Sequence, residues 1–248
     1  MHGAEPIRPA ARAIGAMALA LALLASPARA DFDSALAAVR AQDFDSAVAE
    51  FRTLADAGDP RGQNGLGVLY LRGRGVERDL DAAARWFRLA AEQGLRVAQA
   101  NLGEMHLNGW GVPRDRQLAA AWYRRAAEQG DSDAQTRLGS MLVEGGGIPR
   151  DVVAGREWLE RAAHQGHPEA QVQLAHLYRI GDGVDRDYQR AYAWYGVAAA
   201  GGAEAAPQYR EAVVVFLTEE QLREARAMAR DLYARYGSRS PDRTLVGR

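Results

Sequence analysis

Few side chains in this sequence are spaced for catalysis or metal binding. His164 and His167 are three residues apart, but Gly166 and a predicted helix end lie between them, and no further zinc ligands are evident. Glu104 and Glu144 could face a common groove, although their separation disfavours a paired-carboxylate site. We therefore expect surface histidines, no metal and no cofactor.

The sequence also lacks the common catalytic motifs. GxSxG, HExxH and GxxxxGK[ST] do not occur. There is no cysteine, which excludes disulfides and thiolate metal sites, and all 31 basic residues are arginine, which excludes Schiff-base and P-loop lysines. These absences favour a protein that is not an enzyme. A hydrolase acting on the cell envelope is the least favoured alternative.

The dominant feature of the sequence is a period of 36 residues, kept without insertion or deletion. Such a period is typical of helical solenoids, whose units pack only on their neighbours. The recurring positions include Asp43, Asp79, Asp115, Asp151 and Asp187; Ala55, Ala91, Ala127, Ala163 and Ala199; Gly58, Gly94, Gly130, Gly166 and Gly202; and Trp86, Trp122, Trp158 and Trp194.

Each unit predicts two helices. Residues 80–93 carry one apolar stripe at helical spacing, with Asp79 as its expected N-cap and Gly94 as its left-handed end. A second helix is predicted over about 96–108. The connectors between units each contain two glycines, for which we expect positive φ angles. Small residues in the second helices, such as Gly103, should allow close helix packing.

The terminal segments depart from the repeat. Residues 31–43 predict an N-terminal capping helix, 44–187 four full repeats, 188–237 a degenerate fifth repeat with a C-terminal capping helix, and 238–248 a disordered tail. The C-terminal helix is expected to start at the capping box formed by Thr218 and Gln221. The fold class is therefore predicted to be all-α.

The repeat resembles the Sel-1-like repeat family, a relative of the tetratricopeptide repeats. The shared pattern is Trp86-Phe87, Ala90 to Gly94, Ala98-Gln99, Leu102-Gly103 and Gly109-x-Gly111-Val112-x-x-Asp115. This resemblance implies a right-handed α/α superhelical solenoid. It also implies an adaptor role in a larger assembly, in bacteria often at the cell envelope.

Candidate binding residues are those that vary from unit to unit. In tetratricopeptide-like arrays one helix of each pair lines the concave face, and we assign that role to the second helix. Trp110 is added because its position requires no tryptophan in other units, so an exposed aromatic there could anchor a partner. An ordinary solvated helix face is the alternative interpretation. The candidates are Arg72, Asn101, Glu104, Asn108, Trp110, Arg137, Ser140, Glu144, Gln173, His176 and Arg179.

The N-terminus predicts export. Residues 1–30 contain a basic start, an apolar run of about a dozen residues and an Ala28-Arg29-Ala30 cleavage pattern, and a membrane-spanning helix needs about 20 residues. We expect the periplasm, with secretion or a retained anchor as alternatives. The net charge of −1 gives no reason to expect nucleic acid. The expected partner is a protein or peptide of the envelope, with peptidoglycan as the alternative.

Overall fold

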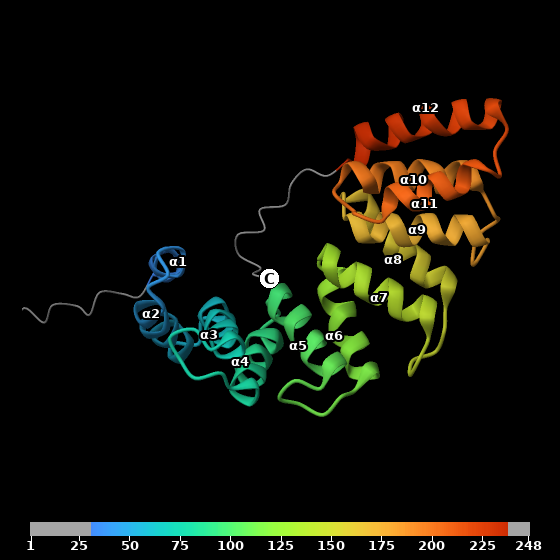
Figure 1. Cartoon of the computed structure of the whole chain (residues 1–248). Coiled ribbons are helices and arrows are strands. Elements are labelled where there is room, and N and C mark those ends of the chain that lie inside the picture. Colours follow the sequence, from blue (N-terminus) through green and yellow to red (C-terminus); the bar gives the residue numbers. More distant parts are fainter. Residues whose placement is uncertain (1–30, 238–248) are drawn as a thin grey trace, which may run out of the picture.

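The structure is a computed structural model, and it describes residues 31–237. These residues form twelve α-helices and no strand, stacked in an open arc (Figure 1). The predicted signal peptide and C-terminal tail lie outside the described residues. The helices are α1 (Phe32–Arg40), α2 (Phe44–Asp56), α3 (Pro60–Arg72), α4 (Leu80–Glu92), α5 (Arg96–Asn108), α6 (Arg116–Glu128), α7 (Ser132–Glu144), α8 (Val152–His164), α9 (Pro168–Ile180), α10 (Tyr188–Ala200), α11 (Ala206–Val214) and α12 (Glu219–Tyr236).

The recurring aspartates and glycines set the helix ends as predicted. Asp79 caps α4 by accepting from the amide of Ala82 at 2.8 Å, and the other four aspartates of this column cap α2, α6, α8 and α10 in the same way. Gly94 follows α4 with a φ of 89°, which a residue without Cβ adopts at little cost. The glycines of every connector also have positive φ, including all three of the connector that contains Gly145, Gly146 and Gly147.

The apolar core consists of four clusters along the arc, and side chains of one unit pack into the cluster of the unit before it. Trp122 and Trp158 are buried in the apolar cluster of the preceding unit. The small residues allow this density: a Cβ placed on Gly103 would lie 3.0 Å from the ring of Tyr123, and one on Gly67 would lie 2.8 Å from the ring of Phe87. The expected close packing at these glycines is confirmed.

The packing unit starts one helix later than the division of 44–187 into four repeats. Among the repeat helices, the most extensive contacts join α3 to α4, α5 to α6, α7 to α8 and α9 to α10. The unit is therefore a second helix, a two-glycine connector and the alanine-rich helix that follows. A period read from sequence fixes the length of a unit, whereas its starting point depends on which helices pack together.

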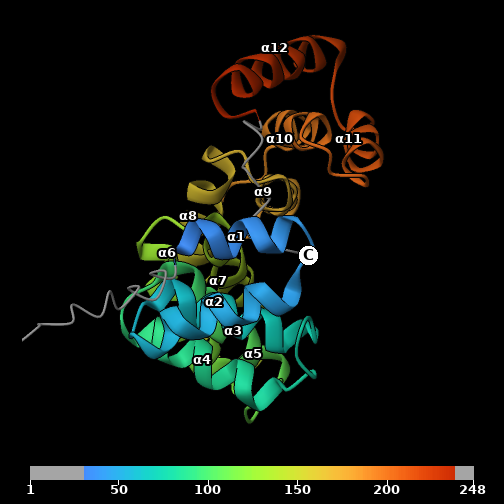
Figure 2. The same cartoon turned by 90° about the vertical axis from the view of Figure 1, so that its left-hand side faces the viewer.

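The C-terminal end is closed by α11 and α12. Figure 2 shows α10 and α11 side by side beneath α12. The capping box of α12 is present, with both reciprocal bonds between Thr218 and Gln221. Ala225 and its apolar neighbours pack on α10, as the stripe predicted. Within residues 31–237 no helix has the length and apolar character needed to cross a membrane.

Candidate functional site

The predicted binding residues lie on α3, α5, α7 and α9 and on one connector. We call this set of residues the second-helix face. Successive second helices are linked by polar side chains along this face: Asn101 donates to Asn64 at 3.0 Å, Arg137 lies 3.8 Å from Glu104, and Ser140 donates to Gln173 at 2.6 Å. The α3–α5, α5–α7 and α7–α9 pairs are thus joined by side chains predicted from sequence.

Glu104 is the centre of a hydrogen-bond network on this face. Its carboxylate accepts from Tyr123 Oη at 2.6 Å and from Asn108 Nδ2 at 2.7 Å, and Arg137 lies beside it. Burial, followed by the adjacent carboxylate, raises the pKa of Tyr123 far above its usual value, so its hydroxyl remains a donor. The carboxylate that sequence analysis left available to a partner is largely occupied inside the protein.

The structure explains much of the variation at the position of Glu104. Glu104 bonds the hydroxyl of Tyr123, 19 residues later, and His176 bonds that of Tyr195 at the same spacing. In the other two units the corresponding pairs are Val68 with Phe87 and Ser140 with Leu159, so the hydroxyl and its acceptor occur together. Variation in this column therefore follows an internal partner as well as any external one.

His176 lies in an aromatic cluster at the C-terminal end of the face. Tyr195 Oη lies within hydrogen-bond distance of its Nδ1, at 2.6 Å, and the ring of Tyr209 from α11 packs edge-on at 4.8 Å. Burial, helped by the charge of Arg179, lowers the pKa of His176, which keeps the imidazole neutral and able to accept. Arg179 itself is exposed. The cluster joins α9, α10 and α11 and leaves a cationic group at its edge.

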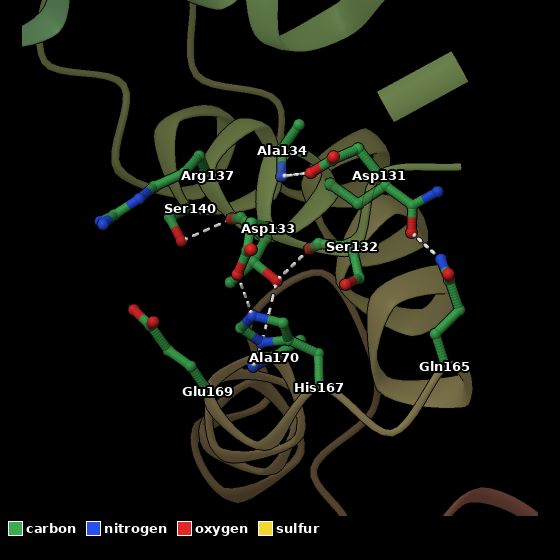
Figure 3. Close-up of polar contacts among 12 residues, drawn as sticks. Asp131, Ser132, Asp133, Ala134, Arg137, Ser140, Gln165, His167, Glu169 and Ala170 are labelled. Atoms are coloured by element: carbon green, nitrogen blue, oxygen red, sulfur yellow. Dashed lines mark hydrogen bonds and ion pairs between the residues drawn. The ribbon is translucent and has the colours of Figure 1, made fainter. Parts of the chain in front are cut away.

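His167 has a structural role that the surface interpretation missed. It replaces the aspartate cap at the start of α9: Nδ1 accepts from the amide of Ala170, and Nε2 lies 2.7 Å from Asp133 on α7 (Figure 3). Thr136 Oγ1 also lies 3.3 Å from Nδ1. His164 is exposed and stacks on the ring of Tyr236 at 4.2 Å. Within residues 31–237 no cluster of three potential metal ligands forms.

The remaining predicted residues sit toward the ends of the second helices. Trp110 is 39% exposed on its connector, held by a backbone bond to Met105. Glu144 is exposed and lies 3.6 Å from Arg116. Burial lowers the pKa of Arg72, at the end of α3. Among the described residues, neither Trp110 nor Glu144 is bonded to the Glu104 network.

Two further sets of residues were assigned no structural role from the sequence. The first is a column of buried glutamines on the second helices. For example, Gln135 Nε2 donates to the carbonyl of Ala127, and Gln135 Oε1 accepts from Gln165, 30 residues later, at 2.7 Å. The second is a column of arginines in the connectors, each able to bond the end of the preceding helix. Arg114, for example, donates from Nε to the carbonyl oxygen of Leu107. Both columns keep the 36-residue period, which was the available signal.

A stack of helix pairs whose second helices are joined by polar side chains defines a helical-repeat solenoid. A scan of protein-family models matches the Sel1 repeat at residues 60–95, 96–131, 132–167 and 168–202. These units have the starting point found in the packing. The chain belongs to the Sel1 repeat family, whose members are in general non-catalytic protein-interaction scaffolds.

Two solved structures illustrate the similarity. The protective antigen c5321 of uropathogenic Escherichia coli, which has an SLR fold, is 34% identical with a TM-score of 0.72, covering 77% of this chain and 41% of its own. A Sel1 repeat protein from Oxalobacter formigenes is 36% identical with a TM-score of 0.63, covering 68% of this chain and 49% of its own. This chain thus spans less than half of either protein. Among curated proteins there is no significant match.

Proposed function

We propose that this protein is an exported scaffold that binds a peptide or protein of the cell envelope along the second-helix face. The observation that carries the proposal is the polar network that joins successive second helices. Helices on the inner side of a curved stack approach one another most closely, and contacts such as Ser140 to Gln173 are of this kind. A polar inner surface of arginine, asparagine and glutamine suits an extended peptide backbone.

The exposed members of the face are the groups that a partner would contact first. Arg137 and Arg179 are both exposed on it, one on α7 and one on α9. Each guanidinium presents several donors to carbonyl or carboxylate oxygens. Asn101 and Gln173 already bond to neighbouring helices, so they hold the surface in shape as well as facing a partner.

The test is partner recovery from envelope extracts on the immobilised protein. Combined Arg137→Ala and Arg179→Ala should abolish recovery of partners that the unmodified protein retains. The matched control is Arg88→Ala with Arg124→Ala, two exposed arginines of the alanine-rich helices α4 and α6. Equal recovery by both double variants, with unchanged melting temperatures, would contradict the assignment of the face.

Export is tested separately from binding. A cleaved signal peptide predicts that protein recovered from the periplasm begins at Asp31, which mass spectrometry of the intact protein measures. Recovery of the uncleaved chain with the membrane fraction would instead indicate a retained anchor.

Peptidoglycan is the second candidate ligand because the ring of Trp110 is exposed on a connector. Co-sedimentation with purified peptidoglycan that is lost in Trp110→Ala supports it. An absence of co-sedimentation removes the glycan proposal and leaves the peptide proposal intact.

A further inference from the structure

A cleft of about 280 Å³ lies between α10, α11 and α12, apart from the second-helix face. Its walls carry three arginines, with Arg210 on α11 and Arg226 and Arg230 on α12. Two tyrosines, Tyr192 and Tyr233, also line it, and its floor is α10 (Figure 2 shows the three helices). The cleft combines aromatic rings with one sign of charge.

The positive charge of the cleft is not neutralised within it. No acidic residue lines the cleft, and among residues 31–237 neither Arg226 nor Arg230 has a hydrogen-bond or ion-pair partner. Arg210 pairs at 3.0 Å with Glu211, its exposed neighbour in sequence, and lies over the ring of Tyr192. Like charges four residues apart on a helix destabilise it slightly. An anion bound between these guanidinium groups would remove that repulsion.

The repeat shows how the floor of the cleft became open and uncharged. The position of Gly196 carries Arg52, Arg88, Arg124 and Glu160 in the other units. The position of Ala200 carries Asp56, Glu92, Glu128 and His164. The last unit thus lacks the long side chains that would fill the space and also the acids that would neutralise the arginines.

Helix capping accounts for only part of this arrangement. A Cβ on Gly196 would lie 3.5 Å from Ala229 Cβ, so a small residue there lets α12 approach α10. Capping also explains the apolar stripe around Ala225. It gives no reason for Arg226 and Arg230, which are exposed and have no bonded partner among the described residues, to line the same cleft as Arg210 without an acidic residue beside them.

We propose that this cleft binds an acidic peptide segment of a partner protein, with carboxylates held by Arg210, Arg226 and Arg230. Guanidinium groups bind carboxylates through paired, charge-assisted hydrogen bonds. The volume of the cleft, about 280 Å³, is just below that of typical ligand pockets, roughly 300 Å³ upward, which suits one or two inserted side chains of a longer segment. Tyr233, which is half exposed, provides a surface for an apolar side chain beside the carboxylates.

The chain's own residues 238–248 do not have the required charge. This segment holds Arg239, Arg243 and Arg248 against Asp242, so it is basic and repelled by the cleft. Charge complementarity therefore selects a segment from another protein. The site is independent of the second-helix face, since the two share no residue.

The probe is a fluorescein-labelled peptide with two glutamates flanking a tyrosine. Its binding is measured by fluorescence anisotropy and compared with that of the same peptide carrying glutamine in place of both glutamates (the glutamine twin). The acidic peptide should bind at least about tenfold more tightly than the twin, and combined Arg226→Gln and Arg230→Gln should abolish that difference. Ala200→Glu, which restores the acid of the repeat at an exposed position, should do the same. Equal binding of the two peptides, or an unaffected double variant, overturns the proposal.

Controls separate this site from other anion binding. Arg85→Gln with Arg88→Gln removes two exposed arginines of α4 that have no bonded partner among the described residues, and it should leave binding unchanged. Full competition by inorganic phosphate, or tighter binding of a single-stranded oligonucleotide than of the acidic peptide, overturns the peptide assignment. Loss of envelope partners in the second-helix variants does not bear on this result, so the two proposals fail separately.

Discussion

Removing one donor from the glutamine column tests whether these buried amides stabilise the solenoid. Gln135 is 4% exposed, and its Oε1 accepts from Gln165 at 2.7 Å, with no other donor to that oxygen among the described residues. Gln165→Ala deletes the donor and leaves the carbonyl oxygen in place. Its expected cost is that of an unsatisfied buried acceptor.

That cost is about 1–3 kcal/mol for a fully buried group. Gln165 itself is exposed, so truncation admits some water to the vacated space, and we expect the lower half of the range, about 1–2 kcal/mol. For a domain of this size, each kcal/mol lowers the melting temperature by roughly 2–4 °C. Urea unfolding followed by circular dichroism measures the free-energy difference directly.

The matched control is Gln117→Ala on α6, which makes the same chemical change at an exposed position without a bonded partner in residues 31–237. It should leave the free energy of unfolding within about 0.5 kcal/mol of the unmodified protein. If both variants have the same free energy of unfolding, the Gln165–Gln135 bond contributes nothing net and the reasoning is wrong.

Three further predictions follow from neighbouring contacts. Gly201→Gln should raise the urea midpoint, because Gln171 Oε1 is buried without a partner and Gly201 occupies the position of the missing donor, with a φ of −79° that glutamine tolerates. Tyr123→Phe should cost about 1 kcal/mol in urea unfolding, whereas adding Glu104→Val should recover most of it by recreating the apolar pair of an earlier unit. Because the pKa of His176 is lowered in the folded protein, the unfolded chain takes up a proton first as the pH falls below about 6.5, and the free energy of unfolding declines there. His176→Gln should therefore reduce the change in urea midpoint between pH 7.5 and 5.5, about one unit either side of that value.

Much of the fold was predictable because its signals are local. Asp79 caps its helix through an amide three residues away, and Gly94 takes a left-handed conformation that other residues adopt at a cost. Both requirements act within one turn of chain, and the period repeats them in register. The resemblance to Sel-1-like repeats implies the same helical solenoid, and the family match confirms that fold.

The candidate binding residues were harder to interpret, because residues in one column of the repeat vary for more than one reason. Glu104 and His176 vary together with a tyrosine hydroxyl 19 residues later, which is visible in the sequence only once the pairing is known. His167 looked like a surface residue, although it takes the place of the aspartate that caps equivalent helices. In both cases the sequence shows the position without the partner that the fold supplies.

These internal partners indicate where unassigned binding capacity remains. Along the second-helix face most variable carboxylates and amides are already bonded to neighbouring helices, and the exposed Arg137 lies 3.8 Å from Glu104, so the partner proposed for this face would use Arg179 or exchange existing bonds. The last unit instead lacks polar side chains that earlier units have, with Gly201 in place of a glutamine and Ala200 in place of an acidic residue. Gly201 leaves one buried acceptor, Gln171 Oε1, without a donor, and Ala200 leaves a cluster of arginines without an anion. A ligand from outside the chain can reach only the arginines, because they line an open cleft.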